Sequence, residues 1–105
     1  DNFTLIGGGA KLDADGIFGL AIQEAKFIGK PGRSPFIPGS KAPQFIRRKV
    51  VRQTLSEFRR ARDIISDPTT PFTSLEIITN NVQAADFLDR IRRKLRIPGR
   101  TVVRQ

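Results

Sequence analysis

The chain has 105 residues, the length of one domain with a single modest core, and a formal net charge of +9 that predicts a polyanionic or acidic partner: nucleic acid, an anionic membrane surface or an acidic protein. It contains no cysteine and no histidine, which excludes disulfides, thiolate metal sites and catalysis by Ser-His or Cys-His pairs. Its apolar runs are too short to span a bilayer, so we expect no membrane insertion, and any chemistry must use carboxylates, Lys, Arg, hydroxyls and a metal.

The N-terminal third of the chain predicts strands followed by a long loop. Residues 3–6 form a short apolar run that is either a strand or the remnant of an element beginning upstream. Residues 10–18 and 20–28 predict two strands of a hairpin that closes near Phe18-Gly19. Residues 29–43 hold too many Gly and Pro for a regular element, so we expect a loop there, either a substrate-binding flap or a plain connection.

Residues 44–66 predict one long helix, because they contain no Gly or Pro and stop before Asp67-Pro68. Apolar residues recur along it at i, i+3 and i+4 spacing. Gln53 and Glu57 fall inside this apolar arc, and buried polar groups need partners. They are therefore candidates for a site that faces the preceding strand; the alternative is a structural hydrogen bond or an ion pair to a core arginine.

The remainder predicts a β-α-β unit. Residues 75–79 are β-branched and predict a strand, Asn80-Asn81 can cap a helix over residues 82–95, and residues 101–103 predict a last strand. A strand, a crossover helix and a second strand favour right-handed parallel pairing. Together with the hairpin, this order of elements predicts an α/β fold with a mixed sheet.

One group of charged residues suggests chemistry. Asp15 stands nine positions before Glu24, and Glu24 and Lys26 are two residues apart on a predicted strand, where their side chains project to the same face. A turn at residues 17–19 would fold Asp15 back beside them. Two carboxylates and an ammonium can hold a hard divalent cation and suit metal-assisted phosphodiester hydrolysis. The alternative is a surface salt bridge across a hairpin.

These residues, in this order of elements, resemble the PD-(D/E)xK, or restriction-endonuclease-like, nuclease superfamily. More narrowly, they are similar to the toxin domains at the C-termini of bacterial polymorphic and contact-dependent toxins. Residues 27–40, the helix with Gln53 and Glu57, and residues 75–80 share in the resemblance. It implies an α/β fold with a mixed central sheet flanked by two helices. The superfamily core usually opens with a helix that carries another acidic residue. Residues 1–6 are too short to form it, so we expect this first core helix to be absent from the present sequence. It either lies upstream or has been lost in this family.

The resemblance also implies roles for individual residues. Asp15, Glu24 and the backbone carbonyl of Ala25 would bind Mg²⁺ or Mn²⁺, and Lys26 would position the attacking water and stabilise the transition state. Gln53 would lie near the site as a further catalytic residue. Asp13 ranks second to Asp15 as a ligand, and Glu57 ranks below Gln53. The residues expected to grip nucleic acid are all basic: Lys30, Arg33, Arg48, Lys49 and Arg52.

The sequence therefore predicts that residues 1–105 are a single C-terminal nuclease toxin domain of a larger secreted protein, delivered to the cytoplasm of a target cell. The expected activity is nonspecific, metal-dependent cleavage of DNA. An RNase of the same fold and a non-catalytic basic nucleic-acid-binding module are the alternatives. The resemblance further implies a cognate immunity protein whose acidic face covers the basic cleft.

Overall fold

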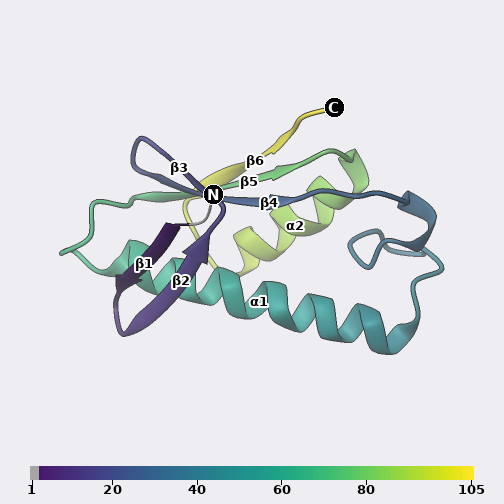
Figure 1. The fold of residues 1–105 in the computed structure, drawn as a ribbon, viewed down its shortest axis with the longest axis horizontal. Coiled ribbons are helices and arrows are strands. Elements are labelled where there is room, and N and C mark those ends of the chain that lie inside the picture. Colours follow the sequence, from purple (N-terminus) through teal and green to yellow (C-terminus); the bar gives the residue numbers. More distant parts are fainter. Residues whose placement is uncertain (1–2) are drawn as a thin grey trace.

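The computed structural model describes residues 3–105, and Figure 1 shows a sheet with two helices on the same side of it. Four strands form the sheet in the order β3-β4-β5-β6, and a separate two-stranded hairpin, β1-β2, lies beside the long helix. In chain order the elements are β1 (Phe3–Gly7), β2 (Ala10–Ala14), β3 (Gly16–Phe18), β4 (Ala21–Lys26), α1 (Gln44–Ser66), β5 (Ser74–Thr79), α2 (Val82–Lys94) and β6 (Gly99–Val103).

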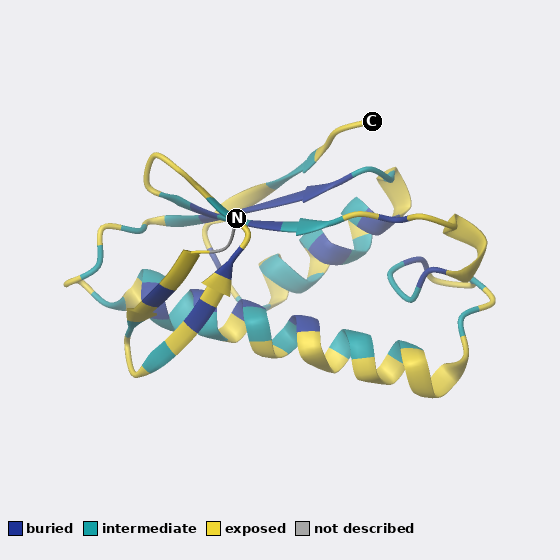
Figure 2. Cartoon of the chain, viewed as in Figure 1, coloured by how far each residue is buried: buried dark blue, intermediate teal, exposed yellow. Residues whose placement is uncertain are grey.

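The sheet is mixed, as the sequence predicts. β3 and β4 form the expected antiparallel hairpin, whereas β4, β5 and β6 run parallel to one another. β5 lies inside the sheet between β4 and β6, and five of its six residues are buried (Figure 2). The β5-α2-β6 unit is confirmed, with Asn81 capping α2 by accepting a hydrogen bond from the Ala84 amide.

The prediction of one strand over residues 10–18 is wrong. The chain breaks at Asp15, so that β2 pairs with β1 and β3 pairs with β4. The two halves have different neighbours, because Leu12 and Ala14 are buried against α1 while Gly16 brings the chain against β4. A side chain at Gly16 would start only 2.6 Å from Gln23 Oε1, so a larger residue there would displace the Gln23 side chain. Asp15 consequently occupies a corner between two sheets.

The hydrophobic core lies between the sheet and both helices. Phe58, Ala61 and Ile64 of α1 and Leu88 of α2 pack with Ile22, Leu75 and Ile77 of the sheet in one cluster. Each large apolar side chain buried in this way contributes roughly 1.5–3 kcal/mol relative to an exposed one. The predicted apolar stripe of α1 is confirmed from Thr54 onward, but Phe45 and Ile46 in its first turns are exposed.

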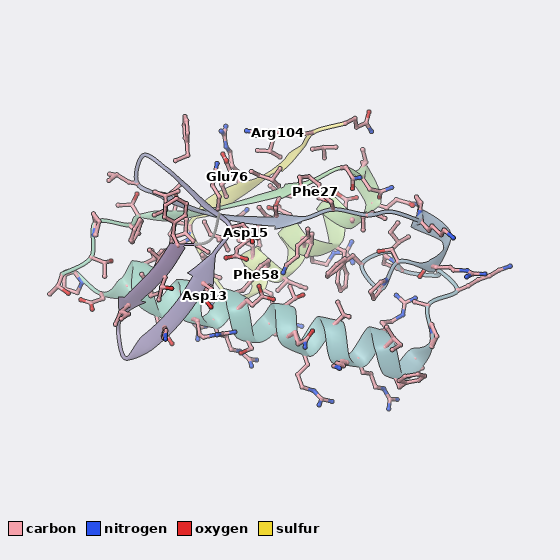
Figure 3. All side chains as sticks on the ribbon, in the orientation of Figure 1. Asp13, Asp15, Phe27, Phe58, Glu76 and Arg104 are labelled. Atoms are coloured by element: carbon pink, nitrogen blue, oxygen red, sulfur yellow. The ribbon has the colours of Figure 1, made fainter. Side chains whose placement is uncertain are left out.

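The opposite face of the sheet carries no helix in the part of the chain that the structure describes. Figure 3 shows Phe27, Glu76 and Arg104 on this open side, away from α1 and α2. Glu76 accepts hydrogen bonds from Gln23 and Arg100 there. Within residues 3–105, the elements that precede β4 are the three strands β1, β2 and β3.

Residues 29–43 form an ordered loop that contains a 3₁₀ turn at Pro31–Arg33. Ile37 in this loop packs with Ile28 and with Ala84 of α2 in a small second apolar cluster. Neither helix in the described range is long and apolar enough to cross a membrane.

Candidate functional site

Asp15 is fixed directly against β4. Its amide donates to the carbonyl of Gln23 at 3.1 Å, and its Oδ2 accepts a hydrogen bond from the Ala25 amide at 2.8 Å. These two bonds tie the corner between β2 and β3 to the strand that carries Glu24. The predicted return of Asp15 to the strand of Glu24 and Lys26 is therefore confirmed, and Figure 3 shows Asp15 on the helix side of the sheet.

Glu24 projects from β4 into the space between the sheet and the helices. It is 1% exposed, and its Oε1 has no hydrogen-bond partner. Burial, followed by the nearby charges of Asp15 and Glu57, raises the pKa of Glu24 to about 8, against the opposing effect of the Lys26 ammonium. A carboxyl group buried in this way holds its proton near neutral pH, and a bound cation would take the place of that proton.

Lys26 forms an ion pair with Glu57 across the gap between β4 and α1. The ammonium donates to both carboxylate oxygens of Glu57, at 3.0 and 3.1 Å, and both side chains are largely shielded from solvent. The expectation that Glu57 faces the preceding strand is confirmed. The ion pair thus fixes the Lys26 side chain of β4 against the Glu57 side chain of α1, 31 residues away in the sequence.

Gln53 and Asp13 are both exposed and, unlike Glu57 and Asp15, do not bond to β4. The expectation that Gln53 belongs to the buried arc is wrong, because Gln53 is exposed and Thr54 occupies the buried position. Gln53 precedes Glu57 by one helical turn and so lies on the same side of α1, nearer its exposed end. Asp13 is exposed on β2 and accepts a hydrogen bond from Thr4 of β1, whereas Asp15 bonds to β4.

The five basic residues expected to bind nucleic acid are all exposed. Lys30 and Arg33 lie on the loop after β4, and Arg48, Lys49 and Arg52 lie on the first half of α1. Arg48 and Arg52 line a shallow groove of about 380 Å³ along α1, together with Arg47, Val51 and Leu55.

The residues at this corner fit a magnesium-type cation. Within residues 3–105 no three acidic side chains are close enough to form a metal site by themselves. Magnesium, however, is commonly held by one or two carboxylates while it keeps several waters and binds substrate phosphate. Asp15 and Glu24 supply two carboxyl groups. Oε1 of Glu24 is buried without a hydrogen-bond partner, so it is free to bind a cation.

A model of the family described as restriction endonuclease fold toxin 2 matches residues 2–98 of the chain. The chain belongs to this family. The resemblance drawn from Asp15, Glu24-Ala25-Lys26 and the order of elements is confirmed, and the mixed sheet with two helices agrees with a restriction-endonuclease-like fold. Membership indicates a nuclease toxin. Searches of curated proteins and of solved structures gave no match.

Two anchoring residues near the site were missed by sequence reasoning. Asn80 bonds both the amide and the carbonyl of Ile28, at 2.7 and 2.9 Å, and so fixes the chain just after Lys26. Arg47 donates to backbone carbonyls of the loop, including Ile37 at 3.1 Å and Ser40 at 3.1 Å. An asparagine directly after a predicted strand is a usable signal for Asn80, although the sequence equally suits a helix cap there. Arg47 stands among other basic residues, and nothing in the sequence singles it out.

Proposed function

We propose that this toxin domain is a metal-dependent endonuclease that hydrolyses phosphodiester bonds, with Asp15, Glu24 and Lys26 as its catalytic residues. The observation that carries the proposal is the convergence of these three residues on β4, with a buried carboxylate next to a fixed ammonium. A hairpin salt bridge, the alternative, does not account for it, because Lys26 pairs with Glu57 of α1 rather than with Asp15 or Glu24.

Asp15, Glu24 and the backbone carbonyl of Ala25 would hold Mg²⁺ or Mn²⁺. When bound, such an ion supplies a Lewis acid for the phosphate and lowers the pKa of a coordinated water. Lys26 places a positive charge beside this pair of carboxylates, where it would stabilise negative charge that develops on the phosphate. Glu57 restricts the position of the Lys26 ammonium, since it accepts hydrogen bonds from it with both carboxylate oxygens.

DNA is the substrate we favour, bound through its phosphates. The exposed basic residues Arg48, Lys49 and Arg52 line the half of α1 that precedes Glu57, and Lys30 and Arg33 lie on the loop that follows Lys26. Phosphate contacts position a duplex without reading bases, so cleavage is expected to be largely nonspecific. Gln53 lies between these basic residues and Glu57 and would contact the bound strand.

The biological setting is also a proposal. A nuclease toxin endangers the cell that produces it, so we expect a cognate immunity protein with an acidic face complementary to this net charge of +9. The domain would be secreted as part of a larger toxin and delivered to the cytoplasm of a target cell.

Cleavage assays test the proposed activity. Purified protein is incubated with supercoiled plasmid and with total RNA, in Mg²⁺ and in EDTA, beside the Glu24→Gln and Lys26→Ala variants. We expect plasmid cleavage that requires the cation and falls by at least about a hundredfold in both variants. Cleavage in EDTA, or full activity in both variants, rejects the site. Cleavage of RNA alone identifies an RNase, and a folded wild-type protein that cleaves neither substrate points to a binding module.

A further inference from the structure

Thr79 lies next to the proposed catalytic residues in the sheet. The register of the parallel strands places it directly opposite Lys26, just as Ile77 lies opposite Glu24. Because alternate residues of a strand share a face, Thr79 projects to the same side as Glu24 and Lys26. Thr79 is the last residue of β5, and Lys26 is the last residue of β4.

The hydroxyl of Thr79 is buried and has no partner. Thr79 is 0% exposed, and within residues 3–105 its Oγ1 and Oε1 of Glu24 are the two buried side-chain atoms that lack a hydrogen bond. Other threonines behave differently: the buried Thr54 donates to the Val50 carbonyl, and Thr101, on the same face of β6, donates to Asp89. The lack of a hydrogen bond is therefore specific to Thr79 and is not shared by these other two threonines.

A hydroxyl at this position is hard to explain by packing. The same face of β5 otherwise carries Leu75 and Ile77, and valine has nearly the same shape as threonine without the cost of burying a polar group. The two orphaned oxygens belong to diagonal neighbours on adjacent parallel strands. The Cβ atoms of such neighbours are roughly 8 Å apart, since strands lie about 4.8 Å apart and two residues along a strand span about 6.6 Å. The Glu24 side chain together with one water molecule spans such a distance, and buried waters typically bridge otherwise unsatisfied polar groups.

We propose that Thr79 is a positioning residue of the active site, which holds a buried water against Glu24 beside Lys26. The hydroxyl donates to the water or accepts from it, and the water completes the hydrogen bonding of the Glu24 carboxyl. Thr79 thereby restricts the orientation of Glu24, and through it the place where the substrate phosphate is engaged. The role rests on the proposed nuclease activity, but the water site does not.

The test compares Thr79→Val, which removes only the hydroxyl, with Thr79→Ser, which keeps it. Thr101→Val is the matched control, since it makes the same change on the same face of the sheet, away from Glu24. We expect Thr79→Val to lower kcat about tenfold with KM nearly unchanged, while its melting temperature stays within about 4 °C of wild type. Thr79→Ser should recover most of kcat. Thr101→Val should lower the melting temperature and leave kcat within about twofold.

A high-resolution crystal structure of the metal-free protein gives a readout that needs no activity. We expect a water within hydrogen-bond distance of both Thr79 Oγ1 and a Glu24 carboxyl oxygen, and its loss in Thr79→Val. No such water, unchanged kcat in Thr79→Val, or equal losses in the Val and Ser variants overturns the inference. If wild-type protein cleaves no nucleic acid, the proposed function fails, and this water alone still decides whether Thr79 and Glu24 form the site.

Discussion

Glu24 is the residue at which stability and the proposed function oppose each other. The fold places its carboxyl between the sheet and the helices, near two other carboxylates, and leaves Oε1 without a partner. Burial without compensation disfavours the charged form, so the metal-free protein retains a proton there that an exposed glutamate would release. A cation bound at the proposed site would replace this proton; without it, the folded state bears the cost of burying a carboxyl group whose Oε1 has no partner.

The pH dependence of stability follows from this shift. The pKa of Glu24 is 4.5 when unfolded and about 8 when folded, so between these values the native state holds a proton that the unfolded state has lost. The free energy of unfolding then falls as pH rises, by up to about 1.4 kcal/mol per pH unit. Glu24→Gln cannot titrate and should lack this slope. Urea unfolding in EDTA from pH 5 to 8 measures it, and parallel curves for the two proteins would contradict the shift.

Whether a residue of the site could be predicted depended on whether its position is set locally. Glu24 and Lys26 share a face because strands alternate, so their spacing was enough. Glu57 was placed correctly by helical periodicity, but Gln53, one turn earlier, was not. Helical periodicity gives the direction in which a side chain points. It does not show how far along the helix the sheet extends, because that extent depends on packing between segments distant in the sequence.

At the scale of elements, the site depends on segments that hold one another at the end of β4. Asn80 fixes the chain after Lys26, Glu57 of α1 holds Lys26 itself, and Arg47 of α1 fastens the loop. The break in the strand at Asp15 also arises at the scale of elements, because β2 pairs with β1 whereas β3 pairs with β4. The local pattern of residues 10–18 carries no information about which strand each half will meet, which is why the sequence predicted a single strand.

Arg47 offers a test of the loop as an element. Its guanidinium donates to several loop acceptors, and removing these bonds should favour local opening of residues 29–43 by about 1.4 kcal/mol, a tenfold rise in the open population. Chymotrypsin cleavage after Phe36 in Arg47→Ala should therefore accelerate about tenfold. Arg48→Ala is the control, since Arg48 is exposed and its loss changes charge equally. Equal cleavage rates in the two variants would show that Arg47 does not fasten the loop.

At the scale of the whole molecule, two groups of exposed basic residues lie at opposite ends of the sheet. Figure 1 shows that the start of α1 lies beside the loop that follows β4, towards the end of the sheet at which β4 and β5 finish. The first half of α1 carries Arg48, Lys49 and Arg52, and β4 and β5 end at Lys26 and Thr79. α2 runs back from Thr79, and its basic last turn lies near the start of β6, at the other end of the sheet. Net charge alone attracts nucleic acid to both ends, but only the first lies near the carboxylates.

Salt dependence distinguishes the two ends. The affinity for a short DNA duplex, measured in EDTA so that it is not cleaved, should fall steeply with salt, with a slope of about −0.9 per phosphate neutralised in a plot of log K against log salt. Replacing Arg48, Lys49 and Arg52 with alanine should make that slope shallower by about 2.7. Replacing Arg90, Lys94 and Arg96, which are exposed at the end of α2, removes the same charge and serves as the control. If DNA binds along α1, the control variant changes the slope by less than about one. Equal changes in the two variants would mean that the duplex responds only to the overall charge of the protein. The basic half of α1 would then not guide the duplex to Lys26.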